Sequence, residues 1–162
     1  MKKLFIINGY AKSGKDEFKK YVSKYISTYN TSIINETKIL VNDLYGESIK
    51  DDERRKLLSD TENFLADVYN IPYQITSAKV DLFLQSNKKV MLIDVRKPLI
   101  IKELVDAFAF QTVLIKNDRH HKANNDADMY VENYNYDYII ENNGTLEELE
   151  QKAIEFVKTL CL

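Results

Sequence analysis

The sequence predicts a three-layer α/β/α fold, in which helices cover both faces of a five-stranded parallel sheet. Short apolar runs alternate with longer segments of helical periodicity, which is typical of strand–helix–strand units. Residues 90–93 (Val-Met-Leu-Ile) are apolar on both faces, as a central parallel strand requires. A turn that contains glycine separates the first apolar run from the first helical segment. With 162 residues, the chain suits a single domain, 1–162, built on one core.

The strands are short runs that end at polar or turn-forming residues. The first is β-branched and aromatic and stops before Gly9, and the central one stops at Asp94. The fifth ends at a turn, Asn142-Asn143-Gly144. The five strands are expected at residues 3–8, 32–35, 90–93, 111–115 and 136–140.

The helices are predicted from apolar periodicity and from their end signals. Pro72 and Pro98 suit a first helical turn, and Thr145 with Glu148 has the spacing of a capping box. The six helices are expected at about 14–29, 36–46, 51–70, 73–86, 98–108 and from 145 onward. Two apolar faces are expected to be buried: Leu57, Leu58, Phe64, Leu65 and Val68 in the third helix, and Leu146, Leu149, Ala153, Phe156, Val157 and Leu160 in the last.

Composition and charge exclude several classes of function. The formal net charge is −2, which does not favour a binder of nucleic acid polymers or of membrane surfaces. The longest apolar runs fall far short of the roughly 18 residues that a membrane span needs. Cys161 is the single cysteine, which rules out an intrachain disulfide and suits a cytoplasmic setting.

Residues 9–16 follow the pattern of a phosphate-binding P-loop, Gly-x-x-x-x-Gly-Lys, with Asp16 where Ser or Thr is usual. Such a loop wraps phosphate in backbone N–H groups and directs a helix N-terminus at it. Lys15 is expected to reach between the β- and γ-phosphates of ATP. The predicted phosphate-binding residues are Gly9, Ala11, Lys12, Ser13, Gly14, Lys15 and Asp16.

Asp16 and Asp94 are the predicted magnesium ligands. Mg²⁺ prefers oxygen ligands, and a carboxylate directly after the P-loop lysine can bind the ion or one of its waters. Asp94 follows a hydrophobic strand, which is the position of the acid that holds Mg²⁺ in P-loop enzymes. Three other readings stay open: Asp16 only caps a helix, the loop has lost nucleotide chemistry, or Asp94 simply ends a strand.

Arginine is rare in this chain and is therefore informative. Only four of the 23 basic residues are arginines, and a guanidinium grips phosphate bidentately where lysine offers a point charge. Arg96 lies two residues after Asp94, so on an extended segment both point to the same side. Arg119 falls in a polar excursion, 117–133, predicted to contain at most a short helix. Adjacent His120 and His121 are predicted to be a solvated pair rather than a metal site.

Three motifs taken together resemble the phage-type deoxynucleoside monophosphate kinases. They are Ser-Gly-Lys-Asp at 13–16, Ile-Asp-Val-Arg at 93–96, and Asn-Asn-Gly-Thr-Leu-Glu-Glu-Leu at 142–149. The phosphomevalonate kinases of animals look like distant relatives, because they share the first motif and an Asp-x-Arg after a strand. The resemblance implies a P-loop kinase fold with a helical acceptor-binding insertion, about 36–87, and a lid, about 117–133.

The resemblance also implies roles for individual residues. Asn142, Gly144 and Thr145 are expected on the adenine side of ATP, and Arg54, Arg55 and Arg96 at the acceptor. Arg119, with Lys122, is expected to close over the reacting phosphates, so the implied catalytic residues are Lys15, Arg96 and Arg119. The chain departs from the family in two places. Lys97-Pro98 stands where many relatives have an aromatic or acidic residue, and His120-His121 with 124–128 stands where a His-x-Ser-Glu-like stretch is expected.

The expected activity is therefore the phosphorylation of a (deoxy)nucleoside monophosphate to the diphosphate, with ATP as donor and Mg²⁺ as cofactor. Two alternatives remain at this stage: a kinase of another small phosphorylated acceptor, such as phosphomevalonate, and a non-catalytic nucleotide-binding module. The base preference is not indicated by any motif, and both a monomer and a homodimer are compatible with the sequence.

Overall fold

A computed structural model describes residues 2–46, 51–120 and 130–160, except the side chains of residues 51, 52, 55 and 120. Strands and helices alternate along the chain as the sequence predicts, with one short 3₁₀ helix, η1 (Asp118–His120), after the fourth strand. Within these ranges no helix is both long enough and apolar enough to cross a membrane.

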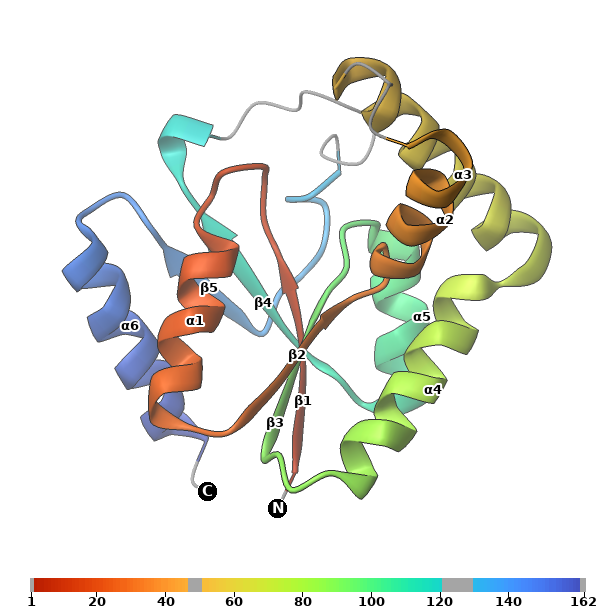
Figure 1. Ribbon diagram of the computed structural model, residues 1–162. Helices are drawn as coiled ribbons and strands as arrows, with labels where there is room; N and C mark the ends of the chain where they lie inside the picture. Colours follow the sequence, from red (N-terminus) through yellow and green to blue (C-terminus); the bar gives the residue numbers. More distant parts are fainter. Residues whose placement is uncertain (1, 47–50, 121–129, 161–162) are drawn as a thin grey trace.

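All five strands are parallel and form one sheet in the order β2-β3-β1-β4-β5 (Figure 1). The strands are β1 (Lys3–Asn8), β2 (Thr28–Ser32), β3 (Val90–Asp94), β4 (Gln111–Lys116) and β5 (Tyr138–Glu141). Because β1 is central, its C-terminal end lies between two neighbours: Ile7 pairs with Asp94 of β3, and Asn8 with Leu114 of β4. This register brings the loop after β1 beside Asp94.

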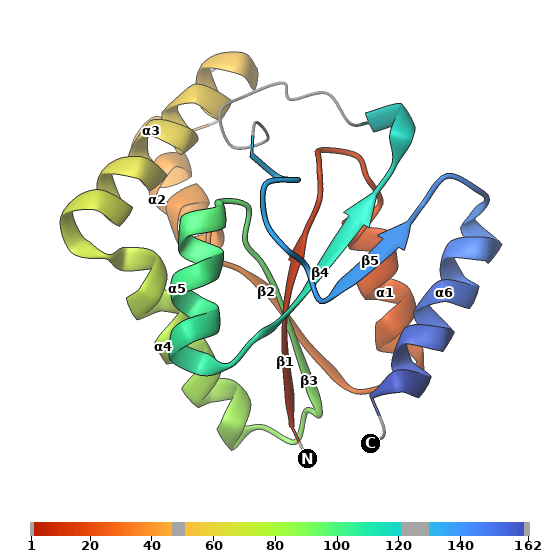
Figure 2. The same ribbon diagram turned by 180° about the vertical axis from the view of Figure 1, so that it is seen from behind.

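Helices cover both faces of the sheet, which confirms the predicted three layers. Helices α1 (Lys15–Tyr25) and α6 (Leu146–Thr159) lie together on one face, and α4 (Ile71–Gln85) and α5 (Pro98–Phe108) lie on the other (Figures 1 and 2). Helices α2 (Asn35–Tyr45) and α3 (Asp51–Tyr69) follow β2 and stand beyond the C-terminal edge of the sheet. They belong to the segment predicted to bind the acceptor.

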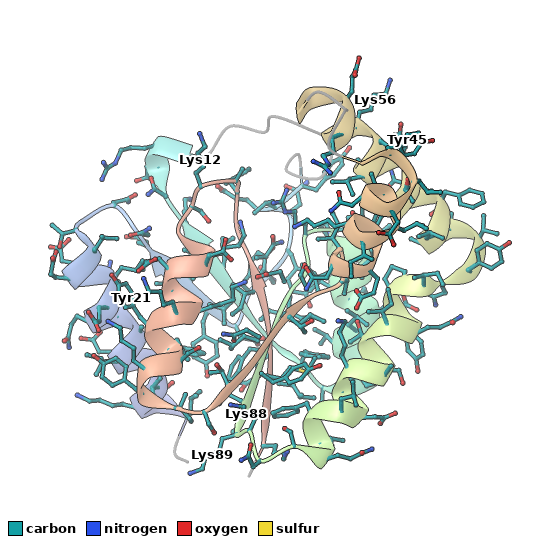
Figure 3. The ribbon with its side chains drawn as sticks, viewed as in Figure 1. Lys12, Tyr21, Tyr45, Lys56, Lys88 and Lys89 are labelled. Atoms are coloured by element: carbon teal, nitrogen blue, oxygen red, sulfur yellow. The ribbon has the colours of Figure 1, made fainter. Side chains whose placement is uncertain are left out.

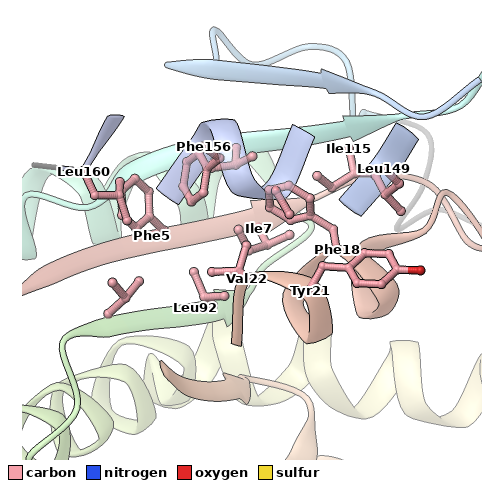
Figure 4. Close-up of a cluster of buried hydrophobic side chains, with 13 residues drawn as sticks. Phe5, Ile7, Phe18, Tyr21, Val22, Leu92, Ile115, Leu149, Phe156 and Leu160 are labelled. Carbon is pink, nitrogen blue, oxygen red and sulfur yellow. The ribbon is translucent and has the colours of Figure 1, made fainter. Parts of the chain in front are cut away.

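A hydrophobic cluster fills the space on each side of the sheet. Between the sheet and helices α1 and α6, Phe5 packs against Phe156 at 5.1 Å between ring centroids, and Phe18 against Phe156 at 5.6 Å (Figure 4). On the opposite face, Ile6, Met91 and Ile93 of the strands pack against residues of α4 and α5. Burial of these apolar side chains stabilises the sheet and thereby fixes the edge at which its loops emerge.

Three details differ from the sequence prediction. Helix α1 ends at Tyr25, earlier than predicted, because Ile26 is extended. The second strand spans Thr28–Ser32, whereas the sequence predicts it at 32–35. The residues of β2 are mostly polar, since this strand lies at the sheet edge, so no apolar run marked it. Leu146 is 59% exposed and does not belong to the α6 core face, whereas the capping box of Thr145 and Glu148 is confirmed.

Candidate active site

The loop between β1 and α1 has a backbone that only glycine tolerates at two positions. Gly9 has φ of 150°, and a Cβ there would lie 2.4 Å from the carbonyl oxygen of Ile115. Gly14 has φ of 99°, and a Cβ there would lie 2.3 Å from Nδ2 of Asn142. The spacing of the two glycines in the motif therefore reflects the close passage of the loop beside β4 and the turn after β5.

The lysine of the motif folds over this loop. Lys15 Nζ donates hydrogen bonds to the carbonyl oxygens of Gly9 at 2.6 Å and Tyr10 at 2.7 Å. Ser13 is fully buried, and its Oγ has no hydrogen-bond partner among the described residues. Ala11 is half-buried, and the exposed Lys12, with φ of 62°, lies at the outer end of the loop (Figure 3). Since α1 begins at Lys15, the backbone N–H groups of its first turn face the loop.

The two predicted magnesium ligands lie close together and share one lysine, Lys19, which the sequence analysis missed. Lys19 Nζ is 3.0 Å from Oδ1 of Asp16 and forms a close ion pair with Oδ2 of Asp94. Asp16 and Lys19 are one helical turn apart, so helical spacing could have placed them on one face of α1. The link from Lys19 to Asp94 could not be read from spacing, because it depends on how α1 packs over β3.

The environment shifts the pKa values of all three groups. The hydrogen bond from Lys19 lowers the pKa of Asp16, whereas burial raises the pKa of Asp94 despite the same neighbour. For Lys19, burial lowers the pKa, but the attraction of Asp94 and Asp16 outweighs it, and the pKa is raised. The second oxygen of Asp94, Oδ1, is buried with no hydrogen-bond partner in the described part of the chain.

These carboxylates fit what Mg²⁺ requires. The described residues contain no cluster of three or more His, Cys, Asp or Glu side chains that could hold an ion. Mg²⁺ in kinases usually takes only one or two carboxylates and completes its shell with phosphates and water. Asp94 has a buried, unpartnered oxygen, and Asp16 stands beside it, so the pair meets that requirement.

A cavity of about 340 Å³ opens at this edge of the sheet. Four predicted residues line it: Lys15, Asp16, Asp94 and Arg96. The remaining lining comes from α1, from β2 and the loop after it, and from helices α2 and α3. These residues are Lys19, Asn30, Thr31, Ser32, Ile33, Ile34, Asn35, Lys38 and Glu62. The structure thus joins the P-loop, the end of β3 and the helical insertion around one space.

Two residues from the insertion were not predicted. Lys38 of α2 contributes an ammonium group and Glu62 of α3 a carboxylate to the cavity wall. Burial raises the pKa of Glu62, while the charges of Lys97, Arg96 and Lys38 act in the opposite direction. Their helical segments were predicted, but which face of each helix meets the sheet edge depends on tertiary packing.

Buried Asn8 connects the P-loop to Arg96. Its Nδ2 donates to the carbonyl oxygen of Arg96 at 3.0 Å and to the hydroxyl of Tyr136 at 2.7 Å. Its Oδ1 accepts a hydrogen bond of 2.8 Å from the backbone N–H of Gly9. One amide therefore fixes the start of the loop and the backbone at Arg96 together, which positions both sides of the cavity relative to each other.

Of the residues predicted for the adenine side, Asn142 belongs to a hydrogen-bonded network around the turn after β5. Asn142 Nδ2 donates to the carbonyl oxygen of Ser13 at 2.8 Å, and Asn117 Nδ2 donates to the carbonyl oxygen of Asn142 at 2.6 Å. Arg119 Nη2 donates to the carbonyl oxygen of Asn143 at 2.9 Å. Arg119 thus lies beside the turn after β5, and it is not among the residues that line the cavity.

Gly144 and Thr145 make the N-terminal cap of α6. A Cβ on Gly144 would lie 1.4 Å from Oε2 of Glu148, and this carboxylate accepts a hydrogen bond of 2.8 Å from Thr145 N–H. The cap explains both residues without a ligand. Their place on the adenine side of ATP therefore stays a prediction.

Arg54 has a structural contact rather than a place in the cavity wall. Its guanidinium donates to Oδ1 of Asn42 and, at 3.2 Å, to the carbonyl oxygen of Gly46, and thereby ties α3 to the end of α2. It is not among the residues lining the cavity. The side chains of Arg55 and His120 and all of His121 and Lys122 lie outside the described residues, as does most of the predicted lid, so those predictions are not addressed.

Comparison with known proteins shows the fold. No protein-family model matches the sequence, and a search of curated proteins found no relative. Dephospho-CoA kinase from Campylobacter jejuni has a similar structure, with 13% identity, a TM-score of 0.59 and coverage of 99% of this chain and 98% of that one. Thymidylate kinase from Candida albicans is also similar, with 12% identity, a TM-score of 0.52 and coverage of 98% of this chain and 92% of that one. Shikimate kinase from Aquifex aeolicus covers 98% of both chains, with 10% identity and a TM-score of 0.52.

Proposed function

We propose that this protein transfers the γ-phosphoryl group of ATP to a small phosphorylated acceptor, and that a (deoxy)nucleoside monophosphate is the first acceptor to test. The observation that carries the proposal is the cavity that joins Lys15 and Asp16 of the P-loop to Asp94 and Arg96 and to Lys38 of the insertion. The similar fold of three kinases that are named for different acceptors supports a phosphotransferase and leaves the acceptor open.

The donor is expected on the P-loop side. The backbone N–H groups of residues 9–16 and the N-terminus of α1 suit the β- and γ-phosphates. Lys15, which contacts the carbonyl oxygens of Gly9 and Tyr10, is close enough to turn its ammonium toward a phosphate on the loop. Asp16 and Asp94 would hold Mg²⁺, which, when bound, neutralises charge on the phosphates and orients them.

The acceptor is expected on the side of α2 and Arg96. Lys19 is already engaged by Asp16 and Asp94, so the other charged groups of the cavity wall are Lys15, Lys38, Arg96 and Glu62. Counted over all seven charged residues of the wall, four positive groups against three negative ones leave a formal charge of +1, opposite in sign to that of a phosphate monoester dianion. Phosphoryl transfer needs such cations, because its transition state spreads negative charge over the equatorial oxygens.

The charge of the cavity does not distinguish between the possible phosphorylated acceptors. Phosphomevalonate and a nucleoside monophosphate present the same phosphate to Arg96 and Lys38, so the charge of the cavity suits both. The family resemblance of the three sequence motifs favours the nucleotide. A non-catalytic module would have no use for Arg96 and Lys38 across the cavity from Lys15, so their presence favours an enzyme.

Substitution of Lys15 tests the proposal. We expect Lys15→Ala to lower ADP release by about a hundredfold or more, because one lost cation at the transferring phosphate costs that much in related chemistry. Circular dichroism and the melting temperature should remain near those of the wild type. Lys20→Ala is the matched control, since Lys20 is an exposed lysine on the same helix that pairs with Glu17 alone among the described residues. Undiminished turnover in the folded Lys15→Ala variant would refute the proposal.

A further inference from the structure

Lys19 is an unusual lysine for its burial and its partners. The residue is only 8% exposed, and its ammonium contacts carboxylates from two elements, Asp16 of α1 and Asp94 of β3. The next lysine along the helix, Lys20, is exposed and pairs with Glu17, one turn away. A surface pair of that kind contributes little, whereas a buried ammonium needs its partners to offset the loss of hydration.

The ammonium stands where two carboxylates converge. Asp94 keeps Oδ1 buried and unpartnered, while its Oδ2 is engaged by Lys19. The side chain of Asp16 is 96% exposed, so it can rotate without disturbing the core. If the ammonium withdrew, two acidic groups at the C-terminal edge of the sheet would lose the cation that contacts them both, and Lys15 would remain as a weaker counter-charge. Two such carboxylates attract a divalent cation more strongly than a monovalent one.

We infer that Lys19 is the internal counter-ion of Asp16 and Asp94 in the nucleotide-free protein and that it competes with the divalent cation for this pair. Lys19 is then a positioning residue: it holds both carboxylates in place and keeps the affinity for free metal low. A divalent cation gains full access to the pair when it arrives with ATP, whose phosphates add ligands. This last clause rests on the proposed function, whereas the competition for the carboxylates does not.

Binding of Mn²⁺ to the nucleotide-free protein tests the competition directly. Electron paramagnetic resonance counts free Mn²⁺ in titrations of the wild type and of three variants. We expect Lys19→Met to bind Mn²⁺ at least about tenfold more tightly than the wild type, because a unit charge in contact with the pair is removed. Lys19→Arg keeps the charge and should resemble the wild type, and Lys20→Met is the matched control for loss of a lysine on α1. Equal Mn²⁺ affinity in folded Lys19→Met and wild type would overturn the inference.

A second measurement uses the wild type alone and covers the case in which Lys19→Met does not fold. Nitrogen-15 spectra of the lysine ammonium groups should show the Lys19 signal retained in the free protein and shifted when Mg²⁺ and ATP are added together. A Lys19 signal that stays unchanged while ATP binds means that the ion pair is purely structural. Failure of ATP to bind at all would instead count against the proposed function, and the Lys19 signal of the wild type titrated with Mg²⁺ alone would then decide the competition, since no shift at saturating Mg²⁺ would overturn it.

Discussion

The proposed donor and acceptor sides of the candidate site are held by different kinds of contact. On the proposed donor side, the loop 9–16 is held by buried Asn8, by half-buried Asn142 and by the ion pairs of buried Lys19. On the acceptor side, α3 is tied to its neighbours by polar contacts such as Arg54 with Asn42 and Lys97 with Asn63. The proposed donor side is therefore assembled by the fold itself, whereas α2 and α3 on the proposed acceptor side are held by more exposed contacts.

The apolar residues of the acceptor helices sharpen this contrast. Phe64 and Val68 were predicted to face a core, yet they are 57% and 54% exposed. The prediction that α3 buries this apolar face is therefore wrong for these two residues, because α3 stands beyond the sheet edge and packs mainly against α2 and α4. Further large apolar side chains of α2 and α3 are exposed: Ile39, Leu40, Leu44, Tyr45 and Tyr69. Elements with so little buried apolar surface open at low free-energy cost, which suits a region that adapts to its substrate.

The largest expected effect comes from Arg96, which lines the cavity between the two sides. We expect Arg96→Ala to lower kcat/KM for the acceptor by about a hundredfold or more, because a bidentate phosphate contact is lost. The affinity for ATP, measured by calorimetry, should change little. Lys97→Ala is the control, since the ammonium of Lys97 is engaged by Asn63. Equal losses in both variants would contradict a specific role for Arg96.

Alanine substitutions at Gly9 and Gly46 compare how strongly each side of the site contributes to the free energy of unfolding. Ala at Gly9 would meet backbone of Ile115 at 2.4 Å, so we expect Gly9→Ala to lower the free energy of unfolding by about 3 kcal/mol. Gly46, at the end of α2, has φ of 64°, but no atom of the described residues lies within 4 Å of a Cβ placed there, so Gly46→Ala should lower the free energy of unfolding by only about 1 kcal/mol. Chemical denaturation measures both. A larger loss for Gly46→Ala would reverse the comparison.

Asn142 tests the link between the P-loop and the turn after β5. Asn142→Ala removes the hydrogen bond to the carbonyl oxygen of Ser13, which should lower the free energy of unfolding by about 1 kcal/mol. We expect a several-fold rise in KM for ATP and none in KM for the acceptor. A rise in KM for the acceptor alone would contradict the proposed position of this turn beside ATP.

Arg54 is expected to show the smallest effect. Its contacts with Asn42 and Gly46 are exposed, so Arg54→Ala should lower the free energy of unfolding by about 0.5 kcal/mol and increase hydrogen exchange at the C-terminal end of α2. A large rise in KM for the acceptor would instead support the acceptor-binding role that the family resemblance implies.

The part of this protein that sequence predicts well is the part fixed by local chemistry. The P-loop glycines follow from backbone geometry, β3 from its continuous apolar run, and the α6 cap from the spacing of Thr145 and Glu148. Each of these signals lies within a few neighbouring residues, so the sequence alone contains it.

The remaining features depend on packing between distant segments. Lys19 meets Asp94 only because α1 lies over β3, and Lys38 and Glu62 meet at the cavity only because α2 and α3 cross the sheet edge. Edge strand β2 was misplaced because its polar residues lack the apolar pattern of a buried strand. No local spacing encodes such contacts.

The most direct test of the account is an assay of ADP release from ATP and Mg²⁺ with a panel of acceptors: the deoxyribonucleoside and ribonucleoside monophosphates and phosphomevalonate. We expect at least one monophosphate to raise ADP release about tenfold or more above ATP alone, with the corresponding diphosphate as product. If the protein binds ATP but no phosphorylated acceptor raises ADP release, the central claim is contradicted and a non-catalytic nucleotide-binding module is the better description.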